Sequence, residues 1–331
     1  MGQPPSDIIR SIQESDRILV MTHVHPDGDA LGSQLALGNI LQSLGKKVFL
    51  YGEEQASHLY EFLPGCDKIK NKSELPPLSQ FSCGIALDCG DCYRLGKAMD
   101  ELLSVQPFIV IDHHSGHKEF GDLRWIDPLR ASTGEMIYDL GVALGGEISY
   151  ETAYCLYAAI VSDTGSFKYS STTADTFRIA RELVIKGVRP AEVAGKLFDN
   201  FTVNRLNLMK MVLDSLELHA GKQVAIITAT REMFAQSGAK QEDCEGFINY
   251  PRSLEKVKVV GFLKEAENGL VAGSLRSKGH DCDVAQVAAA FGGGGHRNAA
   301  GFKITGESLG EVKEKLLAGL LPLVHGGRDG R

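Results

Sequence analysis

The sequence predicts an α/β protein in two parts, a parallel-sheet domain followed by a smaller, mixed α/β domain. The 331 residues are enough for two domains, each with a core of its own. In the first half, short β-rich runs alternate with helical patterns, which is typical of a parallel sheet. A second series of strands follows a helical stretch. We therefore divide the chain into a domain at 1–188, a helical linker at 189–218 and a domain at 219–331.

The first domain is expected to contain strands at residues 18–22, 47–51, 84–87 and 108–111. Residues 30–44 carry apolar side chains at helical spacing and stop before Gly45, a common helix end. Further helices are predicted at 151–161 and 173–186. Ser132 and Glu135 have the spacing of a capping box for another helix at 134–144.

The second domain is expected to hold a strand at 223–228, a strand pair at 256–264 and 269–277, a helix at 284–291 and a final strand at 299–304. The linker before it has a polar-studded helical pattern that follows Arg189 and Pro190. A strand pair combined with a helix in this order predicts a mixed α/β fold.

Composition narrows the class of protein. Hydrophobic residues make up 43% and charged residues 23%, which excludes disordered and fibrous proteins. The formal charge of −7 argues against a protein that coats long nucleic acid, whereas a small anionic substrate is compatible with it. The apolar runs are strand-length, so no membrane association is expected. The seven cysteines do not form an even disulfide framework and we find no signal segment, so we expect a cytoplasmic protein.

Potential metal ligands crowd the loop after the first predicted strand. His23, Asp27 and Asp29 all lie between the strand at 18–22 and the body of the helix at 30–44. In open α/β sheets, the loops at the carboxyl ends of strands form the ligand-binding crevice. Position as well as composition therefore indicates a site. The structural alternative is that Asp29 caps the helix and His23 is an ordinary loop residue.

Three later segments place a carboxylate directly after an apolar run. They carry Asp88, the triplet Asp112-His113-His114, and Asp163. Carboxylates that converge on one sheet edge repel each other unless cations neutralise them, so the pattern predicts a metal cluster. Imidazole with many carboxylates suits Mn²⁺, Fe²⁺ or Co²⁺ better than an all-oxygen Mg²⁺ site, and we expect Mn²⁺ first.

A glycine-rich segment near the C-terminus could bind a phosphate. Arg276 precedes a run of four glycines that ends before His296. The backbone amides of Gly293, Gly294 and Gly295 could approach a phosphate closely, and Arg276 and His296 could supply charge-assisted donors. The alternative is that the run is only a flexible loop.

In order and spacing, the segment from His23 to Ser33 and the later Asp and His motifs resemble the DHH phosphoesterase superfamily. The resemblance implies two divalent metal ions with a hydroxide between them. His23, Asp27 and Asp88 would hold one ion. The other would be held by Asp29, Asp88, His113 and Asp163, so Asp88 would bridge the two.

The same resemblance implies roles for two residues of the triplet. His114 would act on the phosphoryl oxygens, and Asp112 would orient a histidine. His25 and His117 lie beside the motifs and receive no assignment. The segments with Arg276 and the glycine run resemble the DHHA1 substrate-binding domain, which implies an active site in the cleft between the two domains.

Among DHH–DHHA1 proteins of this size, the chain is most similar to the stand-alone group that degrades short oligoribonucleotides (nanoRNA) to mononucleotides. That group also converts 3′-phosphoadenosine 5′-phosphate to AMP. An enzymatic alternative is a phosphodiesterase for linear di-adenylate in a cyclic-dinucleotide pathway. An inorganic pyrophosphatase fits the glycine run less well, and a nucleotide-sensing module would need a degraded metal site. The oligomeric state stays open, with a homodimer among the alternatives.

Overall fold

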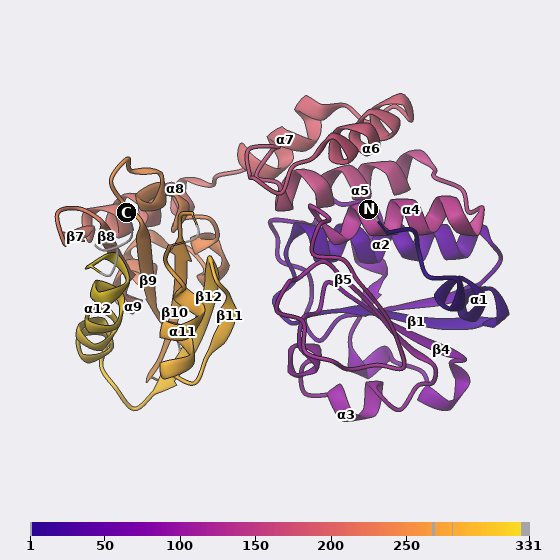
Figure 1. Cartoon of the computed structure of the whole chain (residues 1–331), viewed down its shortest axis with the longest axis horizontal. Coiled ribbons are helices and arrows are strands. Elements are labelled where there is room, and N and C mark those ends of the chain that lie inside the picture. Colours follow the sequence, from indigo (N-terminus) through magenta and orange to yellow (C-terminus); the bar gives the residue numbers. More distant parts are fainter. Residues whose placement is uncertain (1, 267–268, 280, 326–331) are drawn as a thin grey trace, which may run out of the picture. The chain divides into compact units, whose positions relative to one another are not determined.

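The computed structural model describes residues 2–266, 269–279 and 281–325 (Figure 1). The chain divides into two compact units, Met1–Asn200 and Phe201–Arg331. Unit 1 is built on a parallel sheet, called sheet A, and unit 2 on a mixed sheet, called sheet B. The predicted fold class is confirmed. Within the described residues, no helix is long and apolar enough to cross a membrane.

Sheet A has six parallel strands in the order β3-β2-β1-β4-β5-β6. They are β1 (Arg17–Thr22), β2 (Lys47–Tyr51), β3 (Ile69–Lys70), β4 (Cys83–Leu87), β5 (Phe108–Asp112) and β6 (Leu123–Ile126). The four predicted strands are β1, β2, β4 and β5, and each is confirmed to within one residue at either end. The short edge strands β3 and β6 carry no continuous apolar run, so the sequence pattern did not indicate them.

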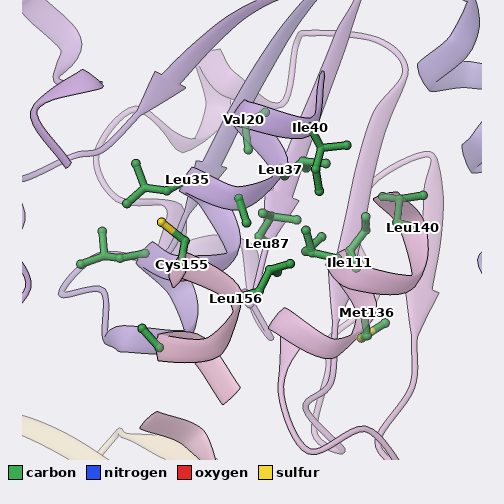
Figure 2. Close-up of a cluster of buried hydrophobic side chains, with 14 of the residues drawn as sticks. Val20, Leu35, Leu37, Ile40, Leu87, Ile111, Met136, Leu140, Cys155 and Leu156 are labelled. Atoms are coloured by element: carbon green, nitrogen blue, oxygen red, sulfur yellow. The ribbon is translucent and has the colours of Figure 1, made fainter. Parts of the chain in front are cut away.

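The helices of unit 1 are α1 (Ser6–Glu14), α2 (Gly28–Ser43), α3 (Met99–Leu102), α4 (Thr133–Leu144), α5 (Tyr150–Asp163), α6 (Ala174–Ile185) and α7 (Pro190–Phe198). Helices α2, α4 and α5 cover one face of sheet A, and α3 lies on the other (Figure 1). The central strands are therefore buried on both sides, which is why they read as continuous apolar runs. Figure 2 shows Val20, Leu87 and Ile111 of the sheet packed among side chains of the covering helices, such as Leu35 and Leu156.

Sheet B has the order β11-β12-β10-β9-β8-β7, and β8 and β9 form its parallel pair. Its strands are β7 (Glu217–His219), β8 (Val224–Ala229), β9 (Val259–Glu265), β10 (Leu270–Ser277), β11 (Gly294–His296) and β12 (Ala299–Thr305). The helices of unit 2 are α8 (Val203–Asp214), α9 (Arg231–Ser237), α10 (Asn249–Ser253), α11 (Val284–Ala290) and α12 (Leu309–His325). The predicted strand pair is the antiparallel pair β9–β10.

The stretch 189–218 is not one helix but two. Helix α7 contacts α5 of unit 1, and α8 contacts β8 of unit 2. The break has a local cause, because the Thr202 side chain accepts a hydrogen bond from the Arg205 backbone N–H at 3.0 Å and so starts a new helix. The boundary between the two units, after Asn200, falls at this break.

Candidate metal centre

Three neighbouring strands of sheet A end at the same level. In the register of the sheet, Thr22 pairs with Leu87, and Leu87 pairs with Ile111. The residues that follow these positions are His23, Asp88 and Asp112, so the three polar side chains begin side by side at the carboxyl edge. The strand order also reverses between β1 and β4, which is where open α/β sheets form their binding crevice.

The loop after β1 adds two carboxylates at the start of α2. The side chain of Asp27 caps the helix, since its Oδ1 accepts from the backbone N–H groups of Asp29 and Ala30 at 3.1 and 3.0 Å. This cap starts α2 at Gly28, two residues before the predicted start. Asp29, which lies in the first turn, is completely buried. The alternative in which Asp29 caps the helix is therefore wrong, because the cap is Asp27.

A close contact between α2 and α5 brings Asp163 to the same place. A Cβ atom on Gly32 would lie 2.5 Å from a backbone carbonyl of α5, and one on Gly28 would lie 2.6 Å from a hydroxyl of α5. Larger residues at either position would push the two helices apart. Because of this approach, the end of α2 that carries Asp27 and Asp29 lies beside the end of α5 that carries Asp163.

The first group of potential ligands consists of His23, Asp27 and Asp88, whose ligand atoms lie within 4.8 Å of one another. The Nδ1 atom of His23 lies 2.9 Å from the carbonyl oxygen of Val24, so Nδ1 carries the proton. Its Nε2 atom faces Asp88, 3.6 Å from Oδ2. The imidazole is therefore oriented as metal-bound histidines are, with a backbone carbonyl holding the second nitrogen.

The second group consists of Asp29, His113 and Asp163. The Nε2 atom of His113 lies 3.2 Å from Asp163 Oδ2, 3.8 Å from Asp29 Oδ2 and 3.5 Å from Asp88 Oδ1. Its Nδ1 atom lies 3.3 Å from the backbone carbonyl oxygen of Arg130, an arrangement like that of His23. Asp88 is thus within reach of both groups, as a bridging ligand would have to be.

The surroundings of this centre shift the pKa values of its carboxylates and histidine in different directions. Burial, followed by the negative charges of Asp88 and Asp163, raises the pKa of Asp29 well above its ordinary value. Burial also raises the pKa of Asp163 to about 7. Burial opposes a charge on His113, but the surrounding carboxylates outweigh it and raise its pKa to about 10. Burial alone would raise the pKa of Asp88, but the nearby side chains of His23, His114 and His113 lower it.

The directions of these shifts agree with an excess of negative charge among the buried carboxylates. Divalent cations would balance it directly. The donor set of carboxylate oxygens and two Nε2 atoms, each with its tautomer set by a backbone carbonyl, fits ions such as Mn²⁺. The residues present therefore fit a pair of divalent cations.

The remaining residues of the triplet form a separate hydrogen-bonded unit. The Nδ1 atom of His114 lies 2.6 Å from Asp112 Oδ1, so its proton is donated to that carboxylate. The same nitrogen lies 3.5 Å from Asp88 Oδ1, and His114 can also be grouped with Asp88 and His113 as a ligand. The contact to Asp112 is much the shorter of the two, so the Nδ1 proton of His114 is directed to Asp112, and its role beside the phosphoryl group stays a prediction.

The start of helix α4 donates hydrogen bonds to the carboxylates of the candidate centre, which the sequence patterns did not indicate. The backbone N–H groups of Thr133 and Gly134 donate to the two oxygens of Asp29 at 2.7 and 2.9 Å, and the Thr133 hydroxyl donates to Asp88 Oδ1 at 3.0 Å. A helix N-terminus thus stabilises two buried carboxylates.

The predicted capping box is wrong in one half: Ser132 caps the helix, but the Glu135 carboxylate accepts from the Ala131 N–H.

The residues predicted to bind substrate lie in unit 2. Arg276 is half-buried on β10, where its guanidinium donates to the carbonyl of Leu275 at 2.9 Å. β10 pairs with β12, and β12 pairs with β11, so Arg276 is opposite Ala299 and Ala299 is opposite His296. The side chain of His296 lies outside the described part of the structure.

Packing and backbone conformation together explain three of the four glycines in the run. A Cβ atom on Gly293 would lie 2.2 Å from the carbonyl oxygen of Gly301, and one on Gly295 would lie 2.6 Å from that of Ala299. Gly292 has a φ of 73°, which favours glycine. A Cβ atom on Gly294 would meet nothing within 4 Å. Gly294 is therefore the glycine of the run for which packing and backbone conformation give no reason.

The fold and the clustered ligands define a class of protein, an α/β protein with a candidate metal centre at the carboxyl edge of a parallel sheet. Comparison with known families is more specific. The DHH family, N-terminal domain, matches residues 17–160, and the DHHA1 domain matches residues 221–320.

Individual relatives support the same assignment. A protein of Thermus thermophilus named bifunctional oligoribonuclease and PAP phosphatase NrnA is 34% identical over 302 residues, which is 91% of this chain and 88% of the relative. The crystal structure of an exopolyphosphatase-related protein from Bacteroides fragilis has a TM-score of 0.88 and 29% identity, with 96% of each chain covered. The cyclic-di-AMP phosphodiesterase GdpP of Geobacillus thermodenitrificans is 26% identical over 96% of this chain but 49% of its own length. The chain belongs to the DHH family, carries a DHHA1 domain, and is a hydrolase.

Proposed function

We propose that this enzyme hydrolyses short oligoribonucleotides to mononucleotides and 3′-phosphoadenosine 5′-phosphate to AMP. The observation that carries the proposal is the pair of ligand groups that meet at Asp88. Each group would hold one divalent cation, with Mn²⁺ as our first choice. When bound, the two cations would supply an activated hydroxide and neutralise the charge that develops around phosphorus.

The protein's own residues would orient the ester and assist proton transfer. Burial opposes a charge on His114, but its hydrogen bond to Asp112 and the charge of Asp88 raise its pKa. In the protonated ring, Nδ1 donates to Asp112 and Nε2 can donate to a phosphoryl oxygen or to the leaving oxygen. Asp112 would hold the ring in that orientation.

The choice of short nucleotides as substrates is supported by two further points. The relative from Thermus thermophilus is named for oligoribonuclease and PAP phosphatase activities and matches nearly the whole chain. In unit 2, the Arg276 guanidinium could supply a cation, and the open space beside Gly294 could admit a second phosphate or a nucleotide. The net charge of −7 agrees with a substrate of few nucleotides.

A second candidate function is a phosphodiesterase for linear di-adenylate. The similarity to the cyclic-di-AMP phosphodiesterase GdpP favours it, although that similarity spans about half of the relative's length. The same metal centre would serve both reactions, because each breaks a phosphate ester bond. The two functions therefore differ in substrate and not in the residues that catalyse hydrolysis.

A panel of substrates with purified enzyme tests the proposal. Di- to pentaribonucleotides, 3′-phosphoadenosine 5′-phosphate, linear di-adenylate and pyrophosphate are compared at equal concentration with Mn²⁺. We expect the short RNAs and 3′-phosphoadenosine 5′-phosphate to be hydrolysed fastest, with activity lost in excess EDTA and restored by Mn²⁺ better than by Ca²⁺. Faster hydrolysis of linear di-adenylate would select the second candidate. Hydrolysis of pyrophosphate alone, or full activity in EDTA, would contradict both.

A further inference from the structure

Asp112 links two histidines, one on each of its oxygens. It ends strand β5 and is completely buried. Its Oδ1 accepts from His114 Nδ1 at 2.6 Å, and its Oδ2 accepts from His117 Nδ1 at 3.0 Å. The backbone N–H of His114 also donates to Oδ1, at 3.2 Å. His117 is therefore one carboxylate away from the histidine that we place beside the reacting phosphoryl group.

The burial of His117 leaves its contact with Asp112 as the hydrogen bond that the ring makes within the described residues. Its side chain is 6% exposed, and within the described residues its Nε2 atom is buried without a hydrogen-bond partner. A buried polar atom without a partner is costly, so an apolar residue would fill the space with less loss. What a histidine adds here is the Nδ1–H that Asp112 accepts.

Neighbouring residues fix the plane of the His117 ring. It stacks on Phe120, with ring centroids 5.3 Å apart and an angle of 21° between the planes. Phe120 in turn packs on Phe108 of β5. The next residue, Lys118, donates its backbone N–H to the carbonyl of Gly90 at 2.7 Å, which ties this loop to the loop after Asp88. These contacts place His117 against the sheet that carries the candidate metal centre.

We propose that His117 is a positioning residue for phosphoester hydrolysis, acting through Asp112 to hold the ring of His114 in its working orientation. The inference rests on the function proposed above. Without the donor on Oδ2, the carboxylate of Asp112 could rotate about its Cβ–Cγ bond. His114 would then lose the fixed acceptor that sets its ring plane and its proton position.

Two substitutions distinguish positioning from packing. In His117→Asn, the side-chain amide can place an N–H near the position of Nδ1, whereas in His117→Gln the amide reaches toward the position of Nε2. We expect His117→Gln to lower kcat about 10-fold, in the range seen when residues that orient catalytic groups are lost, with KM changed less than about two-fold. His117→Asn should recover most of this loss. Both variants should bind as much metal as the unsubstituted enzyme. A rise in KM alone, loss of metal, or equal activity of the two variants would overturn the proposal.

A double substitution tests whether the effect passes through His114. In a His114→Ala background, His117→Gln should cause no further loss of kcat, because the group that it positions is already absent. The same fold-loss in both backgrounds would mean that His117 acts through the fold and not through His114.

A readout that does not depend on activity is the proton NMR signal of the His114 Nδ1–H. It should shift or broaden in His117→Gln and persist in His117→Asn and in the control His219→Gln of sheet B. An unchanged signal in His117→Gln would also overturn the proposal. If the enzyme hydrolyses none of the phosphate esters, the proposed function fails, and this signal still decides the role of His117.

Discussion

The centre on sheet A and the glycine run on sheet B differ in how far the fold itself explains their residues. At the carboxyl edge of sheet A, buried carboxylates such as Asp29 and Asp88 repel each other and contribute no apolar packing. On sheet B, Gly293 and Gly295 are needed because β12 leaves no room for a side chain. Buried groups that cost free energy are the stronger sign of function, because packing gives no reason to keep them.

Removing the shared ligand should have the largest effect. Asp88→Ala removes a carboxylate of the first group that also lies 3.5 Å from His113 of the second, so we expect hydrolysis to fall by more than about 1,000-fold and at least one metal equivalent to be lost. Kinetics and metal analysis of the purified variant measure this. Asp214→Ala, at an exposed aspartate of α8, is the control and should change neither. Near-normal turnover of Asp88→Ala would mean that the buried carboxylates on sheet A are not needed for hydrolysis, which would contradict the comparison with sheet B.

Asp112→Ala should be less damaging, because Asp112 orients histidines and is not in either ligand group. We expect a loss of roughly 10–100-fold in kcat with both metals still bound. Measurement of kcat together with metal content tests this. Loss of a metal equivalent would move Asp112 into the ligand set.

On sheet B, Arg276→Ala should act on some substrates and not on others. If the guanidinium binds a phosphate remote from the bond that breaks, activity on a diribonucleotide should fall about 10-fold relative to activity on bis-p-nitrophenyl phosphate. His296→Ala should change the ratio in the same direction. Arg231→Ala, at an exposed arginine of α9 in the same unit, is the control. Equal losses on both substrates would leave Arg276 with a structural role only.

The smallest expected effects come from alanine substitutions at two neighbouring glycines, one of which should change stability and the other KM. Gly293→Ala should destabilise the protein by about 1–3 kcal/mol, because its Cβ atom would press on the backbone of β12. Gly294→Ala has room for a Cβ and should unfold like the parent, while KM for short nucleotides rises a few-fold if a phosphate approaches this amide. Denaturant unfolding and steady-state kinetics separate the two. A stable Gly293→Ala with normal kinetics would refute the packing argument.

Much of the fold could be predicted because buried parallel strands are local apolar runs. The strands β1, β2, β4 and β5 each stand out between polar loops. The edge strands β3 and β6 are short and half-exposed, so their pairing depends on neighbours that are far away in the sequence. The break between α7 and α8 coincides with the cap at Thr202, which the helical pattern predicted across 189–218 did not mark.

The candidate centre was predictable in its residue types and strand-end positions but not in its supporting contacts. His23, Asp88 and Asp112 follow apolar runs, and this pattern is visible in the sequence. The donors that hold the carboxylates come from Thr133 at the start of α4 and from His117. They meet the centre only through tertiary structure, and a threonine in a first helical turn or a lone histidine carries no signal of its own.

The central claim is that two divalent cations bind at the carboxyl edge of sheet A and share Asp88. Anomalous diffraction from crystals soaked in Mn²⁺, recorded at the manganese absorption edge, tests it most directly. The account predicts two peaks, one contacted by His23 and Asp27, the other by Asp29, His113 and Asp163, with Asp88 contacting both. A single peak, or peaks that leave Asp88 uncoordinated, would contradict it.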